Sequence, residues 1–174
     1  ELGPGPLADW AGRFGFGRPT GIDLPGEASG IVPTPEAAIE LQGRDWQLGD
    51  TQSLAIGQGA LTATPLQVVR MMAAVANGGR LVTPHVVSRL GLPPLAGDQS
   101  PAEIPDDPIR IPLPQPIPGL RAETLERLRE GLERCVADPA GTAHATVFSE
   151  SLAVTGKTGT AETGGGRADH AWFA

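Results

Sequence analysis

Apolar residues recur at helical spacing in three stretches of the chain, residues 6–14, 64–77 and 123–136. Glycines follow the first two stretches directly, as is typical where a helix ends. The third stretch is amphipathic, with an apolar stripe on one side and charged residues on the other. The pattern therefore predicts three helices.

The stretch 64–77 carries the clearest helix signals. Thr64 can cap the helix, Pro65 takes the first helical position, and Asn77 opens the Asn-Gly-Gly run that closes it. Between these ends only Gln67 and Arg70 are strongly polar. We therefore expect this helix to be mostly buried.

The helix predicted at 123–136 is expected to use one side for packing and the other for solvent. Its apolar stripe predicts a packed face, and its charged side is expected to hold ion pairs four residues apart. The packing residues are Leu125, Leu128, Leu132 and Val136, and the pairs are Glu123 with Arg127 and Glu130 with Arg134.

Three further stretches are typical of strands. Residues 80–90 predict a strand broken by Pro84. Residues 152–160 and about 168–174 predict two strands joined by the glycine-rich connection 161–167, which is suited to a hairpin loop.

Proline and glycine separate these elements. Residues 17–35 are rich in turns, and residues 92–118 are proline-rich and acidic, so we expect the latter to form an exposed loop or insertion. The chain begins at Glu1 without an initiator methionine and ends inside an apolar run. We expect residues 1–174 to be a portion of one domain, truncated at both ends.

Composition excludes several classes of function. The net charge of −7 argues against a protein that binds nucleic acid through phosphate contacts. No apolar run approaches the roughly 20 residues that span a bilayer. His85 and His144 lack ligand spacing, so no metal is expected, and Cys135 is predicted to lie in the core.

Lys157 is the only lysine, and it lies in the run Gly-Lys-Thr-Gly-Thr. A phosphate-binding loop would require glycine where Ser151 stands and a helix after the lysine, which this glycine-rich segment does not favour. The second hypothesis is a solvated lysine on a strand. Against it, Gly156 and Gly159 flank the lysine, and a glycine at 159 leaves room for another backbone or a ligand.

The third hypothesis is the Lys-Thr-Gly element of serine acyltransferases. There the edge of a strand pairs with the substrate peptide, and the N–H of Thr160 can face the developing oxyanion. The hydroxyls of Thr158 and Thr160 can hold a carboxylate, while Lys157 supplies positive charge and assists proton transfer.

Longer segments favour this third hypothesis. "LADWAGRFGFGRPTGIDLPGE", "DWQLGDTQSLAIGQGALTATPLQVVRMMAAVANGGRLVTPHVV", "GTAHATV" and "VTGKTGTAE" followed by "HAWFA" occur in this order. Together they resemble the C-terminal part of the transpeptidase domain of penicillin-binding proteins, in the monofunctional class B group similar to penicillin-binding protein 2. The resemblance covers nearly the whole chain outside residues 92–118.

The resemblance implies an α+β fold of the serine β-lactamase and D,D-peptidase type, an antiparallel sheet flanked by helices, incomplete here. It also implies site residues. Lys157, Thr158, Gly159 and Thr160 match the third active-site motif, which recognises oxyanion and carboxylate. Gln58 and Gly59 match a segment bordering the substrate cleft, and a simple tight turn before the Thr64 helix remains the alternative. His170 is expected to pack or to make a local hydrogen bond, and "GIDLPGE" to be scaffold.

The implied function is peptidoglycan D,D-transpeptidation, a serine acyl transfer that needs no cofactor. Stem peptides ending in D-Ala-D-Ala and β-lactams are the implied ligands, with a cell-wall glycosyltransferase as partner. The implied location is the outer side of the cytoplasmic membrane, through an anchor outside this chain. A serine β-lactamase, a β-lactam sensor or a non-catalytic cell-wall scaffold of the same fold remain alternatives.

Two motifs of the family are missing from these residues. Ser-x-x-Lys would need serine at position 154, which is Val154, and Ser-x-Asn would need serine two places before Asn77, where Val75 stands. We expect both motifs upstream. Without the nucleophile, the 174 residues alone are predicted to be inactive.

Overall fold

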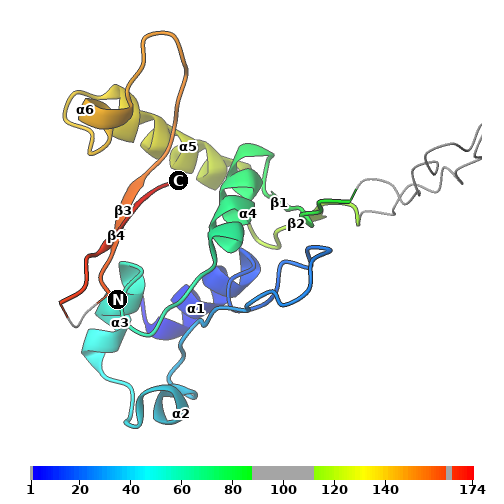
Figure 1. Ribbon diagram of the computed structural model, residues 1–174, viewed down its shortest axis with the longest axis vertical. Coiled ribbons are helices and arrows are strands. Elements are labelled where there is room, and N and C mark those ends of the chain that lie inside the picture. The colour runs from blue at the N-terminus through cyan, green and yellow to red at the C-terminus, as the bar shows by residue number, and fades with distance from the viewer. Residues whose placement is uncertain (1, 88–111, 164–165) are drawn as a thin grey trace, which may run out of the picture.

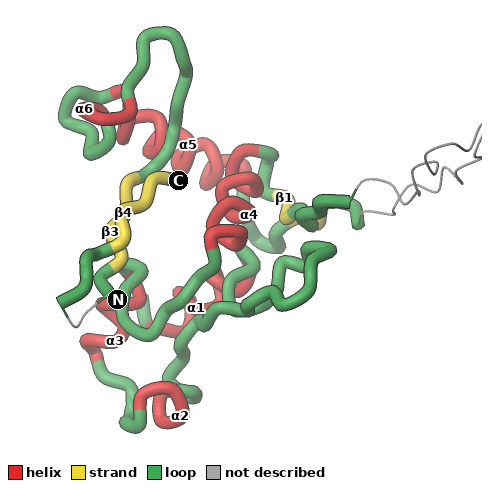
Figure 2. The backbone as a smooth tube through the Cα atoms, in the orientation of Figure 1, coloured by secondary structure: helices red, strands yellow, loops and turns green. Residues whose placement is uncertain are grey.

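The computed structural model describes residues 2–87, 112–163 and 166–174, as helices combined with two antiparallel two-stranded sheets (Figure 1). The elements are α1 (Pro4–Arg13), α2 (Ala38–Gln42), α3 (Leu48–Ala55), α4 (Pro65–Ala76), β1 (Arg80–Leu81), β2 (Gln115–Pro116), α5 (Ala122–Ala137), α6 (His144–Val147), β3 (Thr158–Ala161) and β4 (His170–Phe173). Long connections join them, so loops form much of the backbone (Figure 2). Within the described residues, no helix combines the length and apolar character needed to cross a membrane.

The helix predicted at 6–14 is α1, which begins two residues earlier, because proline is accepted in the first helical turn. Arg13 lies over the Trp10 ring at 4.8 Å and pairs with Asp9 at 2.8 Å. It also donates a hydrogen bond to the Pro118 carbonyl oxygen. Arg13 thus ties α1 to the segment that follows β2.

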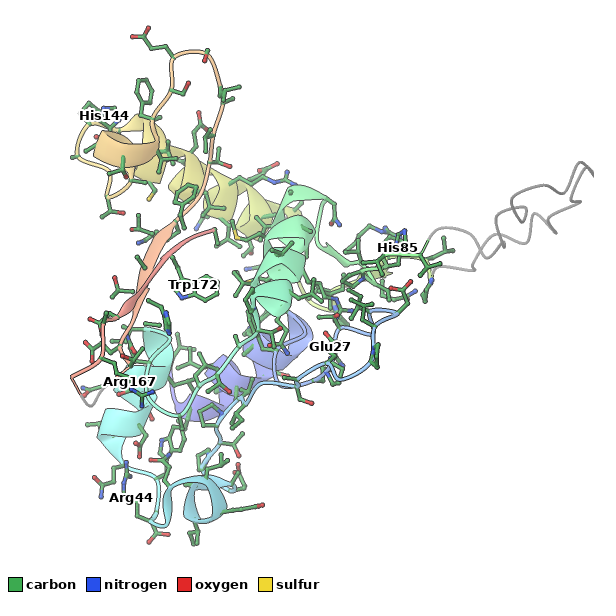
Figure 3. The ribbon with its side chains drawn as sticks, in the orientation of Figure 1. Glu27, Arg44, His85, His144, Arg167 and Trp172 are labelled. Carbon is green, nitrogen blue, oxygen red and sulfur yellow. The ribbon has the colours of Figure 1, made fainter. Side chains whose placement is uncertain are left out.

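Two carboxylates organise the turn-rich segment that follows α1. Glu27 accepts hydrogen bonds from the Thr20 amide and hydroxyl and from the Gly21 amide. Asp23 accepts from the amides of Val86 and Val87, and these bonds lower the pKa of Asp23 below its ordinary value. "GIDLPGE" therefore has the scaffold role that the sequence predicts; Figure 3 labels Glu27 there.

Gln67 of α4 is the centre of the same region, with only 1% of its surface exposed. Its side-chain amide donates to the carbonyl oxygens of Arg18 and Ser29, and its oxygen accepts from the Thr64 amide. The Thr64 hydroxyl accepts in turn from the Gln67 amide, which completes a capping box. A polar residue on an apolar helix thus fastens a loop whose backbone would otherwise be unsatisfied.

The expectation that α4 is mostly buried was wrong for one side of the helix. Val69 is 62% exposed. It lies on an apolar groove of about 640 Å³, which Met72, Leu132, Trp172 and Phe173 also line. Trp172 points from β4 toward α4 across this space (Figure 3).

The core lies where α4 meets the sheet formed by β1 and β2. Ala74, Leu81 and Ile117 are buried together, and Phe14 and Leu120 pack against them. β1 covers only two residues and pairs antiparallel with β2, so residues 82–87 are not the predicted strand, and 88–90 lie outside the described residues.

Residues 92–118 were expected to be an exposed loop. Positions 92–111 lie outside the described residues, but 112–118 contain β2 and the buried Ile117, so this end was predicted wrongly. Hydrogen bonding explains the difference, because Ile117 donates its amide to the Gly79 carbonyl and aligns the segment with β1.

α5 follows the predicted amphipathic pattern in part. Leu125 and Val136 are buried, but Leu128 is 42% exposed. The described chain has neither the Glu123–Arg127 nor the Glu130–Arg134 ion pair. A third arginine of α5, Arg129, makes hydrogen bonds rather than an ion pair along the helix. Its guanidinium donates to the Val75 and Ala76 carbonyls, which have no partner within α4 because they lie at its C-terminal end.

Candidate active site

The segment that carries Lys157 forms a hairpin with the last residues of the chain. β3 pairs antiparallel with β4, with Gly159 opposite Trp172. The Lys157 amide donates to the Ala174 carbonyl at 2.7 Å, and the Ala174 amide donates back at 3.1 Å. The hairpin was predicted, but its strands are shorter than the predicted 152–160 and 168–174, because the ladder begins only at Lys157.

The register determines which backbone groups β3 leaves open. Lys157 and Ala174 exchange both hydrogen bonds, and in an antiparallel ladder such pairs alternate with pairs that exchange none. Thr158 and Thr160 therefore direct their N–H and C=O groups away from β4. They form the open edge of β3, the geometry that the acyl-transfer hypothesis requires for substrate pairing and for an oxyanion donor.

The Lys157 ammonium lies on this open edge. Nζ donates to the Thr158 carbonyl oxygen at 2.7 Å and to the Thr158 hydroxyl at 3.1 Å, and the lysine is exposed. The positive charge is therefore held beside the polar groups of Thr158 rather than extended into solvent. This arrangement places a positive charge and a hydroxyl next to each other at the start of β3.

Gln58 reaches the same edge from the other half of the chain. Its side-chain amide donates to the Thr160 carbonyl oxygen at 2.8 Å, although 102 positions separate the two residues. Gln58 lies in the turn that follows α3. The structure thus brings Gln58 to the Lys-Thr-Gly-Thr strand.

A tight turn positions Gln58. Its amide donates to the Ser53 carbonyl, and Gly57 and Gly59 on either side have φ of 74° and 77°. These left-handed values are accessible to glycine without strain. A Cβ on Gly59 would also lie 3.1 Å from the Ser53 Cβ. Gly59 therefore shapes the turn, and the two alternatives for this segment, turn and cleft border, are compatible.

A cluster of side-chain hydroxyls adjoins β3 on the side of α5, and sequence reasoning missed it. The Thr142 hydroxyl lies 2.8 Å from the Thr158 hydroxyl, and the Cys135 sulfur lies 3.3 Å from Thr142. The "GTAHATV" motif contains Thr142, but spacing alone gave no reason to join it to residue 158.

Cys135 was predicted to be a core residue, which is wrong. It is only half-buried at the end of α5, beside the Thr142 turn. The hydrogen bond with Thr142 lowers the pKa of the Cys135 thiol below its ordinary value, and the charge of Lys157 acts in the same direction.

Gly156, rather than Gly159, is the glycine that packing requires. A Cβ at Gly156 would lie 2.6 Å from the Ala174 carbonyl oxygen and would overlap the Phe173 ring. A Cβ at Gly159 would meet only the Trp172 Cβ, at an ordinary 3.6 Å. The close approach near the lysine is therefore one between the two strands of the hairpin.

In the described part of the chain, no histidine side chain hydrogen-bonds to Cys135, Thr142 or Thr158. His170 was expected to pack or to hydrogen-bond, but it is exposed and its side chain has no hydrogen bond in the described part of the chain. His144 stacks on Phe148 and bonds the Val136 carbonyl, while His85 is exposed at another end of the molecule (Figure 3). Among the described residues, no three metal-ligating side chains come together.

Comparison with known proteins identifies the family. The family model described as "Penicillin binding protein transpeptidase domain" matches residues 1–174. Peptidoglycan D,D-transpeptidase MrdA of Escherichia coli K12 is 32% identical over 174 residues, all of this chain and 26% of the relative. The chain therefore spans about a quarter of that relative's length.

Solved structures agree with this match. A penicillin-binding protein (PBP2) from Helicobacter pylori aligns with a TM-score of 0.77 and 31% identity, over 99% of this chain and 28% of that one. Pseudomonas aeruginosa PBP2, solved in complex with WCK 5153, aligns with a TM-score of 0.74 and 31% identity, over 99% of this chain and 36% of that one. The fold is thus that of the serine acyltransferases, with an incomplete sheet in this chain, as the sequence predicts. The 174 residues belong to the penicillin-binding protein transpeptidase domain family.

Proposed function

We propose that this chain forms the substrate-binding half of the acyl-transfer site of a peptidoglycan D,D-transpeptidase. The observation that carries the proposal is the edge of β3 that faces away from β4, where the ammonium of Lys157 and the backbone groups of Thr158 and Thr160 that β4 does not pair lie together. Membership of the transpeptidase domain family supports the same conclusion.

The chemistry assigns a step to each group. A stem peptide ending in D-Ala-D-Ala pairs with the edge of β3, and the Thr158 and Thr160 hydroxyls hold its terminal carboxylate. The Thr160 N–H stabilises the oxyanion that forms when a serine oxygen attacks the penultimate carbonyl carbon. Lys157 keeps the site positive while the proton moves from the serine to the leaving amine.

The acyl-enzyme then completes the reaction. The bond between the carbonyl carbon and the nitrogen breaks, D-alanine leaves, and an ester joins the peptide to the serine. An amine of a neighbouring stem peptide attacks this ester, and its nitrogen replaces the serine oxygen. We propose that the serine belongs to a Ser-x-x-Lys motif upstream, since that motif does not occur in these residues.

Location and partners belong to the same proposal. We place the site on the outer side of the cytoplasmic membrane, where peptidoglycan is cross-linked, with the anchor outside residues 1–174. A glycosyltransferase partner is supported by likeness to a structure titled "Structural coordination of polymerization and crosslinking by a peptidoglycan synthase complex", which is 33% identical with a TM-score of 0.72. A contact with an MreC-like protein is supported by likeness to the Helicobacter pylori PBP2–MreC complex, which is 29% identical with a TM-score of 0.79.

Covalent labelling of the full-length protein with a fluorescent penicillin tests the proposal. We expect stoichiometric attachment to a serine, and Lys157→Ala should slow it by at least about a hundredfold, the loss typical of removing one preorganised donor. Arg167→Ala, at an exposed position of the β3–β4 connection, is the matched loss of a cation and should label normally. Absence of labelling in the unmodified protein, or equal rates for Lys157→Ala, would overturn the proposal.

A further inference from the structure

Thr142 lies in a turn that α5 and α6 hold rigidly. The Gly141 amide donates to the Asp138 carbonyl at 2.7 Å, and the Ala143 amide donates to the Cys135 carbonyl at 3.1 Å. A Cβ on Gly141 would overlap the last carbonyls of α5, so the turn packs directly against the end of this helix. The Thr142 hydroxyl is therefore presented to β3 from a fixed backbone.

The hydroxyl of Thr158 has two hydrogen-bond partners, Lys157 and Thr142. Lys157 Nζ donates to it at 3.1 Å, and the Thr142 oxygen lies 2.8 Å away. Behind Thr142, the sulfur of Cys135 lies 3.3 Å from the same oxygen. The three side chains of Cys135, Thr142 and Thr158 thus form a continuous chain of groups that can each donate and accept.

The number of protons on each group determines which of these side chains donates to which. A hydroxyl has one proton and two lone pairs, an ammonium can only donate, and a carboxylate can only accept. When a carboxylate takes the Thr158 proton, the two lone pairs of Thr158 remain for Lys157 and Thr142. Thr142 must then donate to Thr158, and the Cys135 thiol can donate to Thr142.

We infer that Thr142 is a positioning residue for anion recognition, which turns the Thr158 proton toward the substrate carboxylate. This inference rests on the proposed function, because it names the group that prepares one of the proposed carboxylate ligands. Without the Thr142 proton, only water would be left to donate to that lone pair of Thr158, and the hydroxyl would be free to rotate away from the substrate. Thr142 itself touches neither the substrate nor the reacting atoms.

The test compares one penicillin with its carboxylate methyl ester on the full-length protein. The acid and the ester share the reacting ring, but only the acid offers the anion. We expect Thr142→Val to slow acylation by the acid by about tenfold, the loss of one charge-assisted hydrogen bond, and to leave the ester rate unchanged. Thr142→Ser, which retains the hydroxyl, should restore the preference for the acid, and Thr142→Ala provides a second variant without the hydroxyl.

The outcomes separate the two proposals. Equal slowing of acid and ester would mean that Thr142 only supports the fold, and unchanged rates with both compounds would mean that it does not orient Thr158. Either result overturns the inference while the unmodified protein still reacts with penicillin. If the unmodified protein forms no adduct with either compound, the proposed function itself is wrong, and the inference fails with it.

Discussion

The side-chain amide of Gln58 donates a hydrogen bond of 2.8 Å to the carbonyl oxygen of Thr160. This bond joins the turn after α3 to the open edge of β3, and it occupies the acceptor next to the N–H that we assign to the oxyanion. The two residues come from opposite halves of the chain, so the bond positions β3 relative to the helical region. A peptide that paired with the edge of β3 would donate to the same Thr160 carbonyl, so it would have to displace the Gln58 side-chain amide.

Loss of the Gln58 amide should weaken the site. We expect Gln58→Leu to lower the rate of penicillin acylation by about tenfold, because one hydrogen bond that orients β3 is removed without a large change in volume. Gln52→Leu, on the exposed side of α3, is the matched control and should react normally. Faster acylation of Gln58→Leu would mean instead that the amide blocks the edge.

Gly156 should tolerate no side chain. We expect Gly156→Ala to lower the free energy of unfolding by about 1–3 kcal/mol, because the new methyl group meets the Phe173 ring and the Ala174 carbonyl. Gly131→Ala, in the middle of α5 with nothing within 4 Å of its Cβ, should stabilise by up to about 1 kcal/mol. Chemical denaturation of both variants gives the comparison, and equal stability of the two would contradict the packing argument.

Asp50 should contribute to stability in a way that depends on pH. Arg44 donates two hydrogen bonds to its carboxylate and the Gln47 amide donates a third, which lowers the pKa of Asp50 from 3.8 to about 2. Because the folded-state pKa is the lower one, this stabilisation is complete above about pH 4 and is lost as the pH falls toward 2. Asp50→Asn should therefore lower the thermal midpoint at pH 7, with a difference that shrinks between pH 4 and pH 2.

The control for this pH dependence is Asp45→Asn, at an exposed position in the loop that precedes α3. It should leave the midpoint almost unchanged at both pH values. A difference for Asp50→Asn that persists undiminished at pH 2 would show that volume or helix capping, rather than the carboxylate charge, explains the effect.

Cys135 should react at a lower pH than an ordinary thiol. Its pKa is lowered first by the hydrogen bond with Thr142, and in the thiolate form the Thr142 proton turns to sulfur. We expect the rate of alkylation by iodoacetamide, followed by mass spectrometry of the peptide that contains Cys135, to rise at lower pH than that of free cysteine. Thr142→Val should move the profile to higher pH, and identical profiles would argue against the hydrogen bond.

Much of this protein could be predicted from local pattern. Periodicity located α1, α4 and α5, and the Thr64 cap marked the start of α4, because the apolar stripe and the cap of a helix are properties of neighbouring residues. The Lys-Thr-Gly-Thr run and its glycine-rich connection located the hairpin for the same reason. The order of the longer motifs was sufficient for the family.

The errors concern contacts between distant segments. Gln67 was noted only as one of two strongly polar residues of its helix, and nothing predicted that it would satisfy a loop 49 and 38 positions away. Ile117 was placed in an exposed loop, although pairing with β1 buries it. Cys135 lies on the predicted helix, but the turn after α5 determines what it touches. Each error concerns a partner that periodicity does not specify.

By itself, then, the sequence determined helices α1, α4 and α5, the hairpin, the family and the identity of the charged residue at the candidate site, but not helices α2, α3 and α6. Only the tertiary structure decided that Gln58 would meet Thr160 and that Thr142 would meet Thr158. The physical reason is that burial patterns record which face of an element avoids water, whereas a hydrogen bond of 2.8 Å depends on how separate elements pack against one another.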